Sequence, residues 1–188
     1  MVSSDGTETR ATIGDAPKRR EDAAFLTGRG IYLDDLVFDD MCHAVLVRPP
    51  HAHARIENIE TDAASAAPGL LAIFTIEDVM ADGLKPLMPT VEANPLDGEP
   101  FSFLPQPLLA DGVVRHVGEP VALVICETVD QALDAAERVV VNYRPLSAVT
   151  TPVEALALGA PKITPEVPGN LYLDWRTGDQ AAVEAAFD

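Results

Sequence analysis

Residues 120–143, PVALVICETVDQALDAAERVVVNY, encode a strand, a helix and a second strand in immediate succession. The segment Pro120–Cys126 is apolar throughout, which indicates a strand buried on both faces. Thr128 and Gln131 have the spacing of a capping box, which predicts that a helix begins there. That helix carries an apolar stripe at helical spacing, formed by Val129, Leu133, Ala136 and Val140. Val139–Tyr143 predicts the return strand, and such a unit places its two strands parallel or nearly adjacent in one sheet.

Shorter elements precede and follow this unit. Three segments with strand-like patterns are Cys42–Val47, Ala54–Ile59 and Leu70–Phe74. Further predicted elements are a helix at Ala23–Leu26 ended by Gly28, a strand within Gly30–Leu33, a helix capped by Asp62, a helix capped by Thr75 and Asp78, a hairpin of Pro107–Ala110 with Val113–Arg115, a helix at Val153–Leu158, a strand at Leu171–Trp175 and a helix after Gly178. The order predicts an α+β fold with a mixed sheet and strand–helix–strand units.

Length and charge bound the class of protein. The 188 residues, 47% of them hydrophobic and 23% charged, suit one ordinary globular domain. Residues 1–12 are polar and are expected to form a flexible tail, which leaves 13–188 as the domain. Thirteen basic and thirty acidic residues give a formal net charge of −17, which disfavours nucleic acid and anionic membranes as partners. The acidity serves solubility or attracts a cationic partner.

The two cysteines indicate a reducing compartment. Cys42 and Cys126 lie in apolar contexts without a C-x-x-C spacing, so we expect buried thiols in a cytoplasmic protein, with one disulfide as the alternative. Two cysteines cannot hold an iron–sulfur cluster unaided. The first residues lack the basic and apolar regions of a signal peptide, and no apolar run is long enough to span a bilayer.

Three short motifs contain residue types that carry chemistry elsewhere. His51 and His53 lie on one side of an extended segment and could grip a metal, or they could pack beside the neighbouring prolines. Gly28-Arg29-Gly30 is similar to part of a phosphate-binding loop, but it lacks the third glycine and the preceding strand. Glu119, close to His116, could act as a general acid or base, whereas Gly118-Glu119-Pro120 is also typical of a tight turn.

Four segments together resemble a known family. They are Arg20–Leu36, Arg48–Ile56, Pro107–Ala110 followed by Val114–Ala122, and Asp134–Tyr143. They are similar, in the same order, to motifs at the N-terminus of the large, molybdenum-bearing chain of the xanthine dehydrogenase, aldehyde oxidase and aerobic carbon monoxide dehydrogenase family. The resemblance runs from about Ile13 to Asp188. Cys42 and Pro49 depart from the family's usual residues, and residues 85–103 match no strong pattern.

The resemblance implies a fold and an assembly. The fold is the α/β-hammerhead domain. The assembly contains molybdopterin, iron–sulfur clusters and FAD, hydroxylates a carbon centre with oxygen from water and passes electrons on through the clusters. In this family the pterin-binding loops and the glutamate base lie in later domains of the large chain. The resemblance therefore carries no catalytic, cofactor-binding or metal-binding role onto any residue of this sequence.

Our first hypothesis is thus a non-catalytic N-terminal domain or subunit, which packs against the remaining molybdopterin-binding domains and the iron–sulfur and flavin subunits. Charge alternation marks Arg20, Glu21, Asp22 and Arg29 as partner-facing, and the Pro-rich segment 85–107 is a further candidate. By itself, this chain would be inactive and free of cofactors, and its uncovered apolar surface would favour self-association.

Two hypotheses of other classes stay open from the sequence. The first is a small stand-alone enzyme of unknown substrate that uses Glu119, His116 and also His51 and His53. The second is a binding module for a cationic protein, whose association would weaken with salt.

Overall fold

The computed structural model of the protein describes residues 13–14, 19–88, 104–173 and 178–187. The chain divides into two compact units, Met1–Met41 and Cys42–Asp188. The tail expected at residues 1–12 lies outside the described residues. Among the helices that are described, none is both long enough and apolar enough to cross a membrane.

The first unit contains two short helices. Helix α1 (Asp22–Leu26) confirms the predicted helix, and Gly28 follows it with a φ of 68°. The strand predicted within Gly30–Leu33 is wrong, because a 3-10 helix, η1 (Leu33–Asp35), begins there instead. The Asp35 carboxylate accepts a hydrogen bond from the Tyr32 N–H at 2.9 Å, and this bond caps the start of the 3-10 helix, after Tyr32 in extended conformation.

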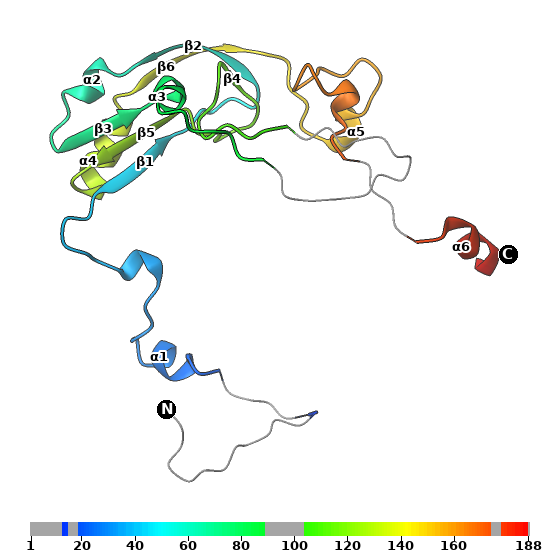
Figure 1. Ribbon diagram of the computed structural model, residues 1–188, viewed down its shortest axis with the longest axis horizontal. Helices are drawn as coiled ribbons and strands as arrows, with labels where there is room; N and C mark the ends of the chain where they lie inside the picture. Colours follow the sequence, from blue (N-terminus) through cyan, green and yellow to red (C-terminus); the bar gives the residue numbers. More distant parts are fainter. Residues whose placement is uncertain (1–12, 15–18, 89–103, 174–177, 188) are drawn as a thin grey trace. The chain divides into compact units, whose positions relative to one another are not determined.

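The second unit contains two three-stranded sheets (Figure 1). The first sheet has the order β1 (His43–Val47), β5 (Ala122–Cys126) and β3 (Leu70–Phe74). The second has the order β4 (Val113–Val114), β2 (Ala54–Glu60) and β6 (Val140–Pro145). The strands predicted before β4 and the strand–helix–strand unit are thereby confirmed.

The pairing of these strands differs from the expected mixed sheet. Each recorded pairing between them is antiparallel, and β5 and β6 lie in different sheets. The prediction that the two strands of the unit share one sheet is therefore wrong. Strand β5 has β1 on one edge and β3 on the other, so it has no edge free for β6, which pairs with β2.

The predicted hairpin before β5 is also wrong. Strand β4 pairs with β2 rather than with residues 107–110. The Ala110 N–H instead donates to the carbonyl of Pro120 at 2.8 Å, and Ile56 donates to the carbonyl of Gly112 at 2.9 Å. The Asp111-Gly112 turn therefore lies against β2, and the strand that follows the turn, β4, pairs with β2.

The two predicted capping pairs, Thr75 with Asp78 and Thr128 with Gln131, do begin helices. The helix predicted to be capped by Asp62 has Thr61 at its N-cap instead, and the helix predicted at Val153–Leu158 spans Pro152–Ala155. The described residues of the second unit contain several helices in all. They are α2 (Asp62–Ser65), α3 (Ile76–Ala81), α4 (Val129–Ala136), α5 (Pro152–Ala155), the 3-10 helix η2 (Pro168–Asn170) and α6 (Gln180–Phe187). Residues 171–173 form no strand, contrary to prediction, and Trp175 lies outside the described residues. In this region the Asn170 side chain accepts a hydrogen bond from the Ile163 N–H and donates to the carbonyls of Ala155 and Pro161. These bonds fix an irregular loop in place of a strand.

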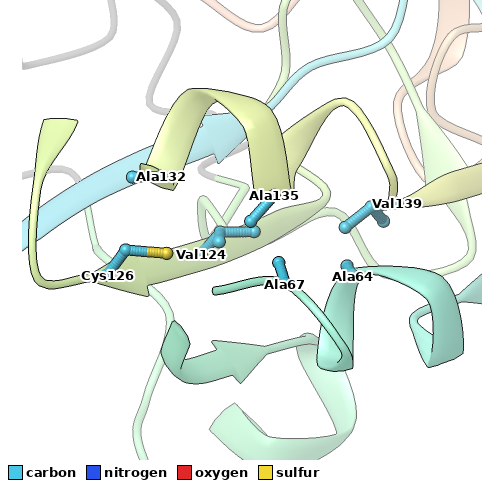
Figure 2. Close-up of a cluster of buried hydrophobic side chains, with 7 residues drawn as sticks. All are labelled: Ala64, Ala67, Val124, Cys126, Ala132, Ala135 and Val139. Atoms are coloured by element: carbon cyan, nitrogen blue, oxygen red, sulfur yellow. The ribbon is translucent and has the colours of Figure 1, made fainter. Parts of the chain in front are cut away.

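Helix α4 covers the inner face of the first sheet through small side chains. Ala132 and Ala135 are fully buried against Val124 and Cys126 of β5 (Figure 2). Of the apolar stripe at helical spacing, Ala136 packs against this cluster, whereas Val129 and Leu133 are 48% and 49% exposed. Alanines on the sheet side let the helix approach the strand closely, so the small residues are buried and the larger ones are not.

Candidate functional site

The residues predicted to face a partner lie in the first unit. Arg20, Glu21 and Arg29 are exposed, and Asp22 is partly buried at the start of α1. The Arg29 side chain donates to the hydroxyl of Thr27 at 3.2 Å. The ion pairs recorded among the described residues involve none of the four predicted charges. Their partner-facing role remains a prediction.

Two glycines in this unit have structural functions. Gly28 follows α1 in the left-handed conformation, and the next N–H, of Arg29, donates to Ala24 at 2.8 Å. A Cβ atom on Gly30 would lie only 2.5 Å from the ring of Phe25, which stacks on Tyr32 at 5.7 Å. The Gly28-Arg29-Gly30 motif therefore ends a helix and admits an aromatic ring, so the turn explains it without a phosphate.

The Pro-rich segment is closed at its base. Leu87 and Gln106 form an isolated antiparallel bridge, with both N···O distances at 2.8 Å. Residues 89–103 lie outside the described residues, so the proposed role of residues 85–107 is not tested by what is described.

The two histidines of His51-Ala52-His53 contact different groups. His53 is 8% exposed, and its Nδ1 atom is 2.7 Å from the carbonyl oxygen of Ser147. His51 lies edge-on to the ring of Tyr143, with centroids 5.0 Å apart. In the part of the chain that the structure describes, no group of three or more His, Cys, Asp or Glu residues is placed to hold a metal ion. Packing and hydrogen bonding account for the pair.

A clasp joins two of the motifs that resemble the family. We call the clasp Arg48, Pro49, Gly118 and Glu119. A guanidinium N–H of Arg48 donates to the carbonyl of Gly118, whose own N–H donates to Pro49 at 3.0 Å. Gly118 has a φ of 82°, a conformation that favours glycine. The clasp thus fixes the loop before β5 to the end of β1.

Glu119 is buried at the turn of this clasp. Its Oε2 atom accepts a hydrogen bond from the Arg115 N–H, and the Nδ1 atom of the exposed His116 lies 3.8 Å away. The structure therefore brings together the predicted acid–base residue and one histidine. The carboxylate is engaged by backbone, which is the arrangement of a turn-closing side chain.

A polar cavity of about 780 Å³ lies elsewhere in the second unit, between β2, β3 and α3. Its acidic lining residues are Glu57, Glu77, Asp78 and Asp111. Two of these four carboxylates already interact with other side chains or with backbone. Glu57 lies 3.5 Å from Arg144, and Asp78 caps α3 by accepting hydrogen bonds from Thr75, which lower the pKa of that carboxyl below its ordinary value of 3.8.

The fold and these motifs match a described family. Residues 27–147 match the family model described as aldehyde oxidase and xanthine dehydrogenase, a/b hammerhead domain. The chain belongs to this family. The α+β hammerhead fold predicted from the sequence is thereby confirmed.

Sequence similarity to curated relatives extends over most of this chain. It is 40% identical over 168 residues to the nicotine 6-hydroxylase large subunit of Paenarthrobacter nicotinovorans, covering 89% of this chain and 20% of that protein. It is 38% identical over 184 residues to the carbon monoxide dehydrogenase large chain of Hydrogenophaga pseudoflava, covering 89% of this chain and 21% of that protein. The hammerhead chain spans about a fifth of the length of these curated relatives.

Solved structures show the same relation. The Cu,Mo carbon monoxide dehydrogenase superposes with a TM-score of 0.73 at 30% identity, over 93% of this chain and 22% of that chain. Quinoline 2-oxidoreductase from Pseudomonas putida 86 superposes with a TM-score of 0.68 at 42% identity, over 76% of this chain and 17% of that chain. The hammerhead fold is thus shared with oxidoreductases that act on different molecules.

Proposed function

We propose that this hammerhead chain is the non-catalytic N-terminal part of a molybdenum hydroxylase or dehydrogenase, and that it scaffolds the catalytic domains. The observation that supports the proposal is that polar groups of the family-like motifs bond the chain's own backbone. Arg48 donates to Gly118, Glu119 accepts from Arg115, and His53 bonds Ser147. Groups used in this way stabilise the fold and do not converge on a reacting atom.

In this proposal the cofactors belong to other parts of the enzyme. Molybdopterin, iron–sulfur clusters and FAD would together supply the insertion of water-derived oxygen at a substrate carbon and the removal of electrons. The residues of this chain do not fit a cluster, since it has two cysteines and Cys126 is fully buried beneath α4. Both cysteines are unpaired, which supports a reducing, cytoplasmic location. The predicted buried thiol is confirmed for Cys126 and is wrong for Cys42, which is exposed.

Purification from the native source tests the proposal. We expect the hammerhead residues to co-purify with molybdenum and iron, either in a longer polypeptide or with separate partner chains. Intact mass and metal analysis of the purified material measure both. A lone chain of 20.0 kDa that binds no partner chain would contradict the proposal.

The partner-facing charges are tested in the assembled enzyme. Deletion of residues 1–22 removes Arg20, Glu21 and Asp22 and should weaken co-elution with the iron–sulfur and flavin subunits on gel filtration. Charge reversal at Arg29 should weaken it less, because that side chain also bonds Thr27. Unchanged assembly after the deletion would show that these charges face solvent.

The pair of Glu119 and His116 supports a second candidate, a small stand-alone enzyme. A carboxylate with an imidazole 3.8 Å away could exchange a proton with a substrate. In that case the metal-free chain alone would turn over substrate, and both Glu119→Gln and His116→Gln would abolish the turnover. Under the scaffold proposal, the isolated chain is inert on aldehydes and purines, and both variants fold.

A further inference from the structure

The first sheet has an outer face that the described part of the second unit leaves uncovered. Side chains alternate between the two faces of a strand, and the register pairs the outward residues in two rows. They are Ala44, Ile125 and Ala72 in one row and Leu46, Leu123 and Phe74 in the other. We call these six residues the apolar face.

None of the six packs against the buried clusters of the described residues. Ala44 and Phe74 are exposed, and the other four are partly exposed. The neighbouring Leu71, at the bulge of β3, is 56% exposed. Strand β5 is apolar at every position, a pattern typical of strands buried on both faces, yet α4 covers only one of them. The sequence of β5 is therefore suited to a second covering layer.

The second sheet provides an internal comparison. The outward positions of β2 and β6 are mostly polar: Arg55, Asn58, Glu60, Asn142 and Arg144, with Val140 the exception. The Asn142 side chain donates to Glu60 at 2.9 Å, and the bulge residue Glu57 lies 3.5 Å from Arg144. The same unit therefore places charged side chains where a sheet faces water and none of them on the apolar face.

We propose that the apolar face is an interface within the assembled enzyme, and that its occupant is an uncharged, hydrophobic surface of the large polypeptide outside the hammerhead region. This inference rests on the proposed function. The matched relatives are more than about four times as long as the hammerhead chain, so most of each such polypeptide lies outside this region. A second copy is a poor occupant, because two chains of net charge −17 repel each other.

Photocrosslinking in the complete enzyme tests the interface and its occupant. Phe74 is replaced by the photoreactive p-benzoylphenylalanine, which keeps an aromatic side chain at that edge strand. The matched control carries the same residue at Glu57 on the second sheet. After irradiation, we expect Phe74 to crosslink to the large polypeptide beyond residue 188, with a yield several-fold above that of the Glu57 control.

Other products would overturn the inference. Equal yields from the two positions would show that the apolar face is no more covered than the polar one. A crosslink to a second copy, to a separate subunit or to residues 1–41 would show that the occupant is wrong. Failure of the proposed function can be told apart from failure of the interface. In that case the purified material would contain neither a polypeptide longer than this chain nor a partner chain, even before irradiation.

Thiol labelling gives an independent measurement if the photoreactive residue prevents assembly. In a Cys42→Ser background, Ala44→Cys reports on the apolar face and Asn142→Cys on the second sheet; both positions are exposed and lie on edge strands. In the complete enzyme we expect the thiol of Ala44→Cys to react with a maleimide about tenfold more slowly than that of Asn142→Cys, because thiol reactivity follows exposure. Equal rates would overturn the interface.

Discussion

The two sheets of the second unit differ most in what they present outward. Both contain three strands, and their recorded pairings are antiparallel. The second sheet follows the rule of a half-buried sheet, with apolar residues inward and mostly polar residues outward. The first has apolar residues on both faces, and in the part of the chain that the structure describes, one helix layer that includes α4 covers one of them. The difference teaches that the first sheet has the composition of a three-layer arrangement, of which the described residues of the second unit supply two layers.

The largest effect is expected from a charge on the apolar face. Leu123→Lys would bury an unpaired ammonium in the proposed interface, at a cost of about 3–5 kcal/mol, or roughly a hundredfold or more in binding. Native gel filtration of the complete enzyme measures the assembled fraction.

The matched change on the other sheet is Asn58→Lys, at an exposed position beside Glu60. We expect it to alter stability and assembly by less than about 0.5 kcal/mol, as is usual for a surface substitution. Equal loss of assembly in the two variants would break the comparison between the sheets.

The next effect distinguishes the two faces of one strand. Val124 is fully buried against α4, whereas its neighbour Leu123 points to the apolar face and is partly exposed. Val124→Ala should lower the free energy of unfolding of the hammerhead chain by about 2 kcal/mol, through lost burial and a cavity. Leu123→Ala should cost about 1 kcal/mol or less in the same chain, because that side chain is already in contact with water.

Urea denaturation of the chain alone measures both variants. A cost for Leu123→Ala that equals or exceeds that of Val124→Ala would mean that the chain itself covers the apolar face.

Much of this fold could be predicted from local patterns. The capping pair Thr128 and Gln131 indicated the start of α4, and Thr75 with Asp78 indicated α3. The continuous apolar run of β5 indicated a buried strand, and the described residues bury the side of it that faces α4. These features depend on residues close together in the sequence, so a single sequence contains them.

The remaining features depend on distant partners. Strand β6 pairs with β2 because both edges of β5 are taken, and no residue of β6 encodes that fact. The clasp joins Arg48 to Gly118, seventy positions apart. Conversely, His51 and His53 are close in sequence, which left a metal site and packing as alternatives; their contacts with different groups are those of packing and hydrogen bonding.

Extremes of pH should affect the two sheets separately, with smaller effects. Asp78 lies in the first turn of α3, and the hydrogen bonds from Thr75 lower the pKa of its carboxyl. Their contribution to stability is therefore complete above pH 3.8 and is lost as the pH falls through the lower pKa of the folded state. For this exposed cap we expect about 0.5 kcal/mol. On the second sheet, burial raises the pKa of Tyr143 above 10.0, so stability should fall as the pH rises past that value.

Thermal unfolding as a function of pH measures both. Asp78→Asn should flatten the acid side alone and Tyr143→Phe the alkaline side alone. If Asp78→Asn changed the stability at alkaline pH, or Tyr143→Phe the stability at acid pH, the assignment of the two pH ranges to these two residues would be wrong.

The smallest effect concerns the isolated chain, in which the described residues leave the apolar face uncovered. Hydrophobic contact favours self-association through this face, while the net charge of −17 opposes it. Because salt screens the repulsion over about 10 Å at 0.1 M and about 3 Å at 1 M, we expect weak association, with a Kd of about 1 mM, that strengthens as salt is added. Sedimentation equilibrium measures this, and Leu46→Gln on the apolar face should abolish it while Asn142→Gln should not. Association that weakens with salt would instead indicate pairing of opposite charges, and would place the contact on the polar sheet.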